Sequence, residues 1–221
     1  MDTALKERTQ EADPAVINTT VVEVKVSGSK GYLFLKRLCD VLVSFCGLMI
    51  LAIPMVIIGV LIRVDSKGPA LFCQERLGKN GKPFTMYKFR SMRIDAEANG
   101  PQWAEKNDCR CTKFGRLIRK SRIDELPQMI NILKGEMSFV GPRPERACFY
   151  DEFEKYIPHF RQRLLVQPGL TGHAQVNGGY ELKPEEKIVY DMEYIANRSV
   201  KMDLLCIWKT VRVVFSHDGA R

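Results

Sequence analysis

The stretch KFGRLIRKSRIDELPQMINILKGEMSFVGPRP, residues 113–144, combines positive charge, two adjacent acids and an arginine held between prolines. The cations that precede the acids are Lys113, Arg116, Arg119, Lys120 and Arg122. The acids are Asp124 and Glu125, and the arginine is Arg143. Because cations surround the two carboxylates, we expect both acids to remain ionised. An ionised Asp can attack a phosphorus centre or hold a divalent metal ion.

The apolar spacing predicts a helix directly after the two acids. One helix face is formed by Leu126, Met129, Ile130 and Leu133. Pro127 fits only the first turn, and Gly135 is a typical stop. The acids are therefore expected at the helix N-terminus, where the helix dipole favours negative charge. A helix cap is the commoner use of such acids, so the pattern alone favours a structural explanation.

The prolines at 142 and 144 fix the backbone φ angle on both sides of Arg143. A stiff backbone suits a guanidinium group that grips phosphate through two parallel hydrogen bonds. The residues from Arg119 to Pro144, with R-I-D-E-L-P-Q and G-P-R-P, closely resemble the bacterial sugar transferases known as monotopic phosphoglycosyl transferases. A motif of this length is highly specific, and it reverses the balance in favour of catalysis.

The resemblance covers about residues 32–215 and implies a reaction. A UDP-sugar gives its phosphosugar to undecaprenyl phosphate, and UMP is released, as the first membrane step of a surface polysaccharide or glycoconjugate pathway. Asp124 is expected to attack the phosphorus and form a covalent aspartyl intermediate, and Glu125 to help position the metal or the acceptor. Both acids are expected to hold Mg²⁺. A direct displacement without a covalent step is the enzymatic alternative.

Four cations and one acid are assigned to the substrates. The expected phosphate ligands are Lys88, Arg90, Arg119 and Arg143. By sequence alone Asp191 is an ordinary helix charge, and the resemblance makes it a supporting polar residue near the site. The resemblance leaves the sugar undetermined, and it leaves room for a homo-oligomer.

The composition points to an anionic partner. The chain has 221 residues, a formal net charge of +8 and a pI near 9.1. Nucleic acid, an anionic membrane surface and phosphate-bearing substrates all fit this charge. The competing class is a membrane-anchored basic module that binds nucleic acid or anionic lipid without catalysis. We expect no nucleic-acid partner, because the acid pair among the cations would repel a phosphate backbone. Seven cysteines with three histidines make a zinc site improbable.

Residues 41–62 contain no charged side chain. As a straight helix this run is about 33 Å long, enough to span a bilayer core of roughly 30 Å. Pro54 interrupts the run, and basic residues flank both ends. These features favour a re-entrant helix broken at Pro54, whose two ends face the cytoplasm. A bitopic anchor and a buried core helix are the alternatives. Ile53 replaces the serine that many small members of the family carry before this proline.

Residues 68–92 are predicted to form a β-hairpin with a turn at Asn80-Gly81. Alternation in its second arm places Lys88 and Arg90 on one strand face. The arm resembles the substrate-side strand of the family, which is the reason for assigning these cations to phosphate. A solvated strand face is the simpler explanation.

The C-terminal half is expected to be helical around a glycine-rich segment. Residues 145–163 form a helix pattern interrupted by Pro158, with aromatic side chains in the core rather than at the membrane. Residues 166–180 resemble a family segment in which Gly169 and Gly172 would let the backbone approach a ligand. His173 and Gly179 depart from the residues usual there. Residues 185–198 and 203–215 are further helices, the last one interfacial or docked on the core.

We therefore expect an α+β fold that is mostly helical. It would consist of a tail (1–31), a re-entrant membrane helix (32–66) and a cytosolic catalytic domain (67–221) with a β-hairpin and interfacial amphipathic helices. The expected location is the cytoplasmic face of the inner membrane, with membrane lipid as a partner.

Overall fold

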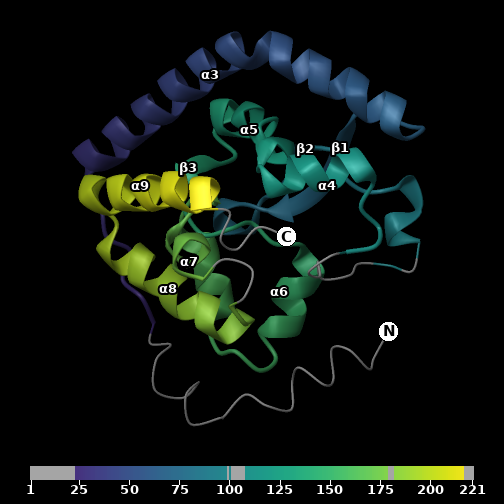
Figure 1. The fold of residues 1–221 in the computed structure, drawn as a ribbon. Coiled ribbons are helices and arrows are strands. Elements are labelled where there is room, and N and C mark those ends of the chain that lie inside the picture. The colour runs from purple at the N-terminus through teal and green to yellow at the C-terminus, as the bar shows by residue number, and fades with distance from the viewer. Residues whose placement is uncertain (1–22, 99, 101–107, 179–181, 217–221) are drawn as a thin grey trace.

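A computed structural model describes residues 23–98, 100, 108–178 and 182–216 (Figure 1). Residues 1–22 of the expected tail lie outside the described residues, and so does Gly179. Residues 23–29 form neither helix nor strand. Helices and strands carry the labels of Figure 1 below.

The longest element is helix α3, Lys30–Asp65. Ser29 caps its first turn by accepting a hydrogen bond from the Tyr32 backbone N–H at 3.2 Å. The helix is continuous through Pro54, and Figure 1 shows it bent like an arch over the rest of the molecule. The position of this helix in a bilayer, including the break at Pro54, stays a prediction.

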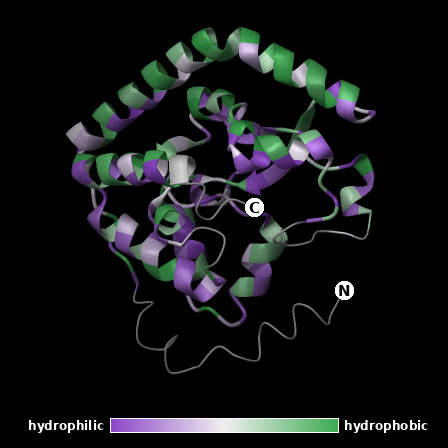
Figure 2. Ribbon diagram, in the orientation of Figure 1, coloured by the Kyte–Doolittle hydropathy of each residue, from purple (hydrophilic) through white to green (hydrophobic). Residues whose placement is uncertain are grey.

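Helix α3 exposes its apolar side chains. Among the described residues, it is the helix whose length and composition suffice to cross a membrane. Only 6% of its most apolar 18-residue window is buried, whereas the core helix of a soluble protein buries most of its residues. Figure 2 shows hydrophobic colour along most of the arch. The helix therefore needs an apolar environment other than the protein core.

The predicted hairpin is confirmed. Strands β1, Leu71–Leu77, and β2, Pro83–Phe89, pair antiparallel from Leu71 opposite Phe89 to Leu77 opposite Pro83. The turn between them contains a 3₁₀ segment, Lys79–Gly81, in which Asn80 has a left-handed φ of 58°. Asn tolerates that conformation better than most residues, which explains the turn signal in the sequence.

The two acids do not lie at the N-terminus of the helix that was predicted to follow them. Helix α4, Lys113–Lys120, is followed by a separate 3₁₀ turn, η3, Ile123–Glu125, which contains both acids. Helix α5, Gln128–Lys134, begins only after Pro127 and ends at Gly135, whose φ is 84°. The helix and its stop are confirmed, but the acids belong to the turn before it.

A short parallel pair of strands was not predicted. Strand β3, Ser138–Val140, pairs with β4, Gly169–Thr171. A Cβ atom at Gly169 would lie 2.1 Å from the backbone nitrogen of Gly141, and one at Gly172 would lie 2.1 Å from the Gly141 carbonyl oxygen. These glycines therefore allow two backbone segments to approach closely, and the approach to a ligand that the sequence suggested stays a prediction.

Apart from η2, which has no buried residue, the remaining elements surround the main core. They are η2 Ile94–Glu97, α6 Ala147–Phe153, η4 Phe160–Leu165, α7 His173–Asn177, α8 Pro184–Asn197 and α9 Val200–Ser216. Phe149, Phe153 and Ile157 are buried, which confirms the expected core position of this aromatic face. The predicted fold class, mostly helical α+β with a long apolar N-terminal helix, is confirmed.

Candidate active site

A cavity of about 430 Å³ opens between the β-hairpin, η3 and the loop that contains Arg143. Among the described residues that line it, eleven are Lys or Arg and three are Asp or Glu. The cavity is therefore strongly positive and suited to a ligand with several negative charges. Asp124 is one of its three acids, and Lys88, Arg119 and Arg143 also line it.

A strained turn presents Asp124 to this cavity. Arg122, directly before η3, has a left-handed φ of 59°, a conformation that costs energy for a residue with a side chain. The turn leaves Asp124 and Glu125 each only 7% exposed. In the described part of the chain, Asp124 lines the cavity whereas Glu125 does not. The two neighbouring acids are thus placed for different tasks.

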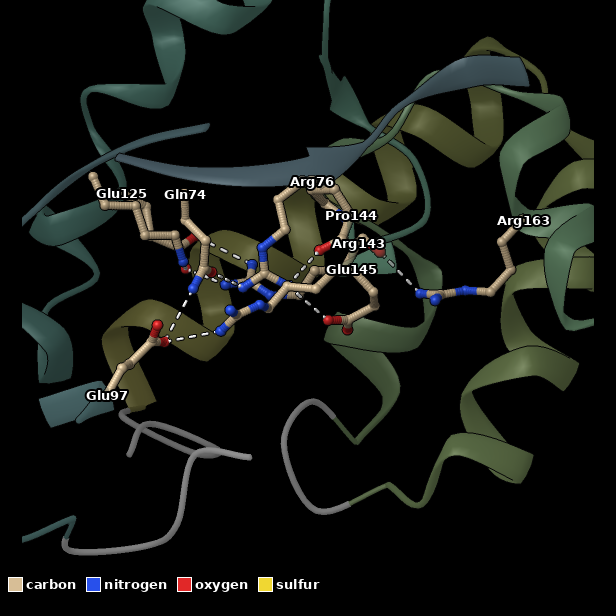
Figure 3. Close-up of polar contacts among 10 residues, drawn as sticks. Gln74, Arg76, Glu97, Glu125, Arg143, Pro144, Glu145 and Arg163 are labelled. Carbon is tan, nitrogen blue, oxygen red and sulfur yellow. Dashed lines mark hydrogen bonds and ion pairs between the residues drawn. The ribbon is translucent and has the colours of Figure 1, made fainter. Parts of the chain in front are cut away.

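Glu125 is held by two of the predicted phosphate ligands, and Figure 3 shows its pairing with Arg143. Arg143 Nη2 lies 2.7 Å from Glu125 Oε1, and Lys88 Nζ lies 3.6 Å from the same oxygen. Burial raises the pKa of Glu125, but the positive charges of Arg143 and Lys88 outweigh it and leave that pKa lowered. Glu125 therefore remains ionised and fixes two cations at the cavity.

The environment shifts the pKa of Asp124 in the opposite direction. Burial, followed by the negative charge of Glu125, raises the pKa of Asp124 to about 6. At this acid the loss of solvation outweighs the neighbouring cations. A carboxylate with a pKa of about 6 is still mostly ionised at neutral pH and is more basic than an ordinary Asp.

The backbone around Arg143 is fixed from two sides. The Gly169 backbone N–H donates to the Pro142 carbonyl oxygen at 2.9 Å, and Arg163 Nη2 donates to the Arg143 carbonyl oxygen at 3.0 Å. Together with the flanking prolines, these bonds fix the backbone from which the Arg143 side chain extends. The geometry supports a guanidinium group aimed into the cavity by a rigid loop.

Asp191 acts through Arg163 rather than at the cavity itself. Asp191 is 1% exposed, and its Oδ2 accepts from Arg163 Nε at 2.7 Å. Within the described residues Arg163 lines the cavity, but Asp191 does not. Burial raises the pKa of Asp191, and the charge of Arg163 opposes that rise. Asp191 thus holds Arg163, which in turn holds the Arg143 backbone.

The strand position of Lys88 is fixed by Asn131, a fully buried residue of α5. Its Oδ1 accepts from the Tyr87 backbone N–H at 3.1 Å, and its Nδ2 donates to the Thr85 carbonyl oxygen at 2.7 Å. The amide therefore ties α5 to the backbone next to Lys88. Sequence patterns could not assign this role, because a lone Asn in a helix pattern carries no distinct signal.

Arg90 and Arg119 lie at the cavity but also have structural partners. Arg90 donates to the carbonyl oxygens of Ser66 at 2.7 Å and Ile62 at 3.4 Å, at the C-terminal end of α3. It therefore ties the C-terminal end of α3 to the end of β2 and has little left to offer a phosphate. Arg119 Nη1 lies 3.1 Å from Cys111 Sγ, a weak contact that a phosphate could replace.

A polar network along β1 was missed by the sequence analysis (Figure 3). Arg76 Nη1 pairs with Glu145 Oε2 at 3.0 Å, and Gln74 Nε2 donates to Glu97 Oε1 at 3.1 Å. Arg146 Nη1 also lies 3.0 Å from that Glu97 oxygen. Residues 74–76 are all polar, so no alternation in the sequence marks residues 74 and 76 as one face of the hairpin arm.

The donor set suits magnesium better than a transition metal. No group of three or more His, Cys, Asp or Glu that could hold a metal occurs among the described residues. Of the two expected ligands, Asp124 faces the cavity, and Glu125 is engaged by Arg143 and Lys88. Mg²⁺ commonly binds one or two carboxylates and takes its other ligands from water and substrate phosphates. The residues present fit such a shared site.

Comparison with known proteins gives a match over most of the chain. Residues 31–217 match the family model described as "Bacterial sugar transferase". A protein of Aeromonas hydrophila, named UDP-N-acetylgalactosamine-undecaprenyl-phosphate N-acetylgalactosaminephosphotransferase, is 44% identical over 86% of this chain and 46% of its own length.

Two further relatives have related names. A Bacillus subtilis protein, a putative undecaprenyl-phosphate N-acetylgalactosaminyl 1-phosphate transferase by name, is 53% identical over 60% of this chain and 74% of its own. A UDP-glucose:undecaprenyl-phosphate glucose-1-phosphate transferase of Xanthomonas campestris is 45% identical over 81% of this chain and 38% of its own. The chain thus spans less than half of the Aeromonas and Xanthomonas relatives.

Proposed function

The chain belongs to the bacterial sugar transferase family, and we propose that it transfers a sugar 1-phosphate from a UDP-sugar to undecaprenyl phosphate. The names of the three relatives describe this type of reaction with N-acetylgalactosamine or glucose. The products would be undecaprenyl-diphosphate-sugar and UMP, in the step that starts a surface polysaccharide or glycoconjugate. The observation that carries the proposal is Asp124, a buried carboxylate of raised pKa in a cationic cavity.

The proposed reaction has two displacements at one phosphorus atom. An oxygen of Asp124 bonds to the phosphorus that carries the sugar, and the bond from that phosphorus to the bridging oxygen breaks. UMP leaves with the bridging oxygen and its electron pair. A phosphate oxygen of undecaprenyl phosphate then attacks the same phosphorus, and the bond to Asp124 breaks. The raised pKa of Asp124 makes the carboxylate a stronger nucleophile than a solvated Asp.

The cations would stabilise the charge that shifts in both steps. Arg143 is positioned by Glu125 and by the Arg163–Asp191 pair, and Lys88 by Glu125 and Asn131. Arg119 lines the same cavity. Preorganised donors of this kind act where charge develops, without reorganising during the reaction. Mg²⁺, held by Asp124 or Glu125 together with the donor's phosphates, would offset part of the negative charge.

We propose further that α3 enters and leaves the membrane on one side. Near its N-terminus Lys36 pairs with Asp203 of α9 at 2.8 Å, and Arg37 Nη2 donates to the Leu133 carbonyl oxygen of α5 at 2.8 Å. At its C-terminus Arg90 binds the carbonyl oxygens of the last turn. A helix whose two ends contact one domain has both ends on that domain's side, which supports the re-entrant path and a cytoplasmic catalytic domain.

The test is UMP release by detergent-solubilised protein with Mg²⁺ and undecaprenyl phosphate. The donors are UDP-N-acetylgalactosamine, UDP-glucose and UDP-galactose. We expect release with one of them, loss of release on chelation of Mg²⁺, and loss in Asp124→Asn. Asp151→Asn, which changes an exposed carboxylate outside the cavity, is the matched control and should retain activity. Full activity of Asp124→Asn would exclude the nucleophile, and salt-sensitive nucleic-acid binding that survives Asp124→Ala would favour the non-catalytic alternative.

A further inference from the structure

The wall that β1 contributes to the cavity changes in chemical character along the strand. Phe72, Gln74 and Arg76 alternate along β1, so their side chains share one face, and all three line the cavity. In this order the three side chains are an apolar ring, an amide and a cation. Phe72 lies directly opposite Lys88 in the antiparallel pair. An aromatic ring therefore stands beside a cation that the proposed function assigns to phosphate.

The apolar end of this wall is exposed to solvent. Leu71 is 41% exposed, Phe72 37% and Ile94 68%, and all three line the cavity. The sugar and the phosphates of a donor gain little from exposed hydrocarbon side chains. An apolar ligand that covers them would remove apolar surface from water, which is favourable by about 25 cal/mol per Å².

This apolar end adjoins the C-terminal turns of α3. A Cβ atom at Gly68 would lie 2.5 Å from Ile94 Cδ1, and one at Gly59 would lie 3.6 Å from the Ala70 Cβ. Arg90, whose guanidinium binds the last carbonyls of α3, lines the same cavity. Figure 1 shows β1 and β2 beneath the C-terminal half of the arch. The exposed side chains at the cavity thus continue the apolar surface of the membrane helix.

We propose that Phe72 and Ile94 form a binding strip for the isoprenoid chain of the acceptor. This inference rests on the proposed function and assigns the lipid end of the same site. The acceptor's phosphate lies near Lys88, and its first isoprene units lie against Phe72 and Ile94. The rest of the chain continues along the C-terminal end of α3 into the bilayer.

Charge and polarity assign the two substrates to different residues of the cavity. The cationic centre around Lys88 and Asp124 receives a phosphate, and the apolar strip receives hydrocarbon. Gln74, Glu97 and Arg146, which lie next to the strip along β1 and η2, offer hydrogen-bond donors and acceptors that suit a sugar nucleotide. A polyprenyl phosphate has one charged end followed by an apolar chain, which matches a cationic centre followed by an apolar strip. The strip therefore contributes to acceptor binding and has no direct part in the donor half-reaction.

The first experiment detects binding without requiring turnover. The probe is geranyl phosphate with a diazirine in its second isoprene unit, added to the full chain in detergent and activated by light. We expect labelled peptides from residues 69–94, with labelling competed by farnesyl phosphate and reduced in Phe72→Gln/Ile94→Gln. Labelling that falls only on α9, or that farnesyl phosphate leaves unchanged, would overturn the proposal.

The second experiment separates acceptor from donor. In Phe72→Gln and in Ile94→Gln the KM for undecaprenyl phosphate should rise about tenfold, equivalent to ~1.4 kcal/mol. The donor KM and the UMP burst without acceptor should match the wild type. Val189→Gln, a change of similar size at a partly exposed residue of α8, should leave both KM values unchanged. An unchanged acceptor KM in both strip variants, or an equal rise in donor KM, would refute the strip.

These experiments distinguish the strip from the reaction itself. If the wild type releases no UMP with any donor, the proposed function fails, while photolabelling of residues 69–94 still reports a prenyl-phosphate site. If UMP is released and labelling falls elsewhere, the proposed function stands and the strip is excluded.

Discussion

Asp124 and Glu125 are neighbours in the chain, yet their surroundings act on them in opposite directions. Burial raises the pKa of Asp124, whereas Arg143 and Lys88 overcome burial at Glu125. Asp124, the proposed nucleophile, is thereby made more basic, and Glu125, which binds two cations, is kept charged. The turn that places the two acids in these different surroundings begins at Arg122, which has a left-handed φ.

The raised pKa of Asp124 predicts how the first half-reaction depends on pH. Only the ionised carboxylate can attack, so the single-turnover rate of UMP release without acceptor should fall roughly tenfold per pH unit below about 6. Above pH 7 the rate should be nearly constant. Omitting the acceptor removes the titration of its phosphate from the profile. A rate that is flat between pH 5 and 8 would contradict the assignment of Asp124 as the titrating nucleophile.

The same shift predicts that the nucleophile costs stability. The pKa of Asp124 is higher in the folded chain than its ordinary value of 3.8, so the folded state binds the proton more tightly. Stability therefore falls as pH rises from about 4 to 6, and the ionised group is unfavourable above that window. Asp124→Asn should raise the free energy of unfolding at pH 7.5 by on the order of 1–3 kcal/mol while it abolishes turnover.

The measurement is thermal unfolding in detergent at pH 7.5 and at pH 4, with Asp151→Asn as the control. The stabilisation by Asp124→Asn should shrink at pH 4, where the wild-type carboxyl is protonated in the folded and increasingly in the unfolded chain. A variant that is less stable than the wild type at pH 7.5 would show that Asp124 makes a favourable structural interaction instead.

At the scale of elements, patterns of local spacing predicted the hairpin, α5 with its glycine stop, and the apolar helix α3. Each depends on neighbours within a few residues, which a sequence displays directly. The β3–β4 pair joins segments about 30 residues apart and has only three residues per strand, so no periodic sequence pattern indicates it. For the same reason the sequence suggested a ligand near Gly169 and did not show that the Gly141 backbone lies close to it.

In the candidate site too, contacts between residues distant in the chain are the ones that the sequence could not predict. Asp124, Glu125, Lys88 and Arg143 lie in one cluster, and Arg119 lines the cavity with three of them; their roles stay predictions. Sequence could not show that Arg90 serves the end of α3, because its partners are backbone carbonyls distant in the chain. It also could not show that Asp191 reaches the site through Arg163, a pairing that appears only when η4 packs on α8.

The Arg163–Asp191 pair yields a prediction about how η4 and α8 hold together. Both side chains are at most 2% exposed, so removing one leaves an unpaired buried charge. Asp191→Ala should therefore destabilise the protein by about 3–5 kcal/mol. Asp151→Ala, which removes the exposed Arg161–Asp151 pair, should change stability by at most about 1 kcal/mol. Denaturant unfolding of both variants tests the contrast, and equal effects would refute it.

At the scale of the whole molecule, α3 and the catalytic domain form one unit. Asp203 accepts from Tyr32 at 2.9 Å and from Lys36 at 2.8 Å, both on α3, and its other oxygen accepts from Tyr194 of α8 at 2.8 Å. Helix α9, which contains Asp203, also exposes Leu204 and Trp208. The apolar surfaces of α3 and α9 therefore belong to one rigid body, which can rest on a single membrane face.

The single-face arrangement predicts which positions on α3 a water-soluble thiol reagent can reach. In a cysteine-free chain, Lys30→Cys and Lys67→Cys flank the two ends of α3, and Ile53→Cys lies on its exposed apolar surface. In inside-out membrane vesicles, a membrane-impermeant maleimide should label both end positions and leave Ile53→Cys unlabelled. In right-side-out vesicles it should label none of the three, whereas a membrane-permeant maleimide should reach the two ends. Labelling of one end from each side would mean that α3 crosses the bilayer, and the contacts of both ends with one catalytic domain would then be incompatible with the protein in its membrane.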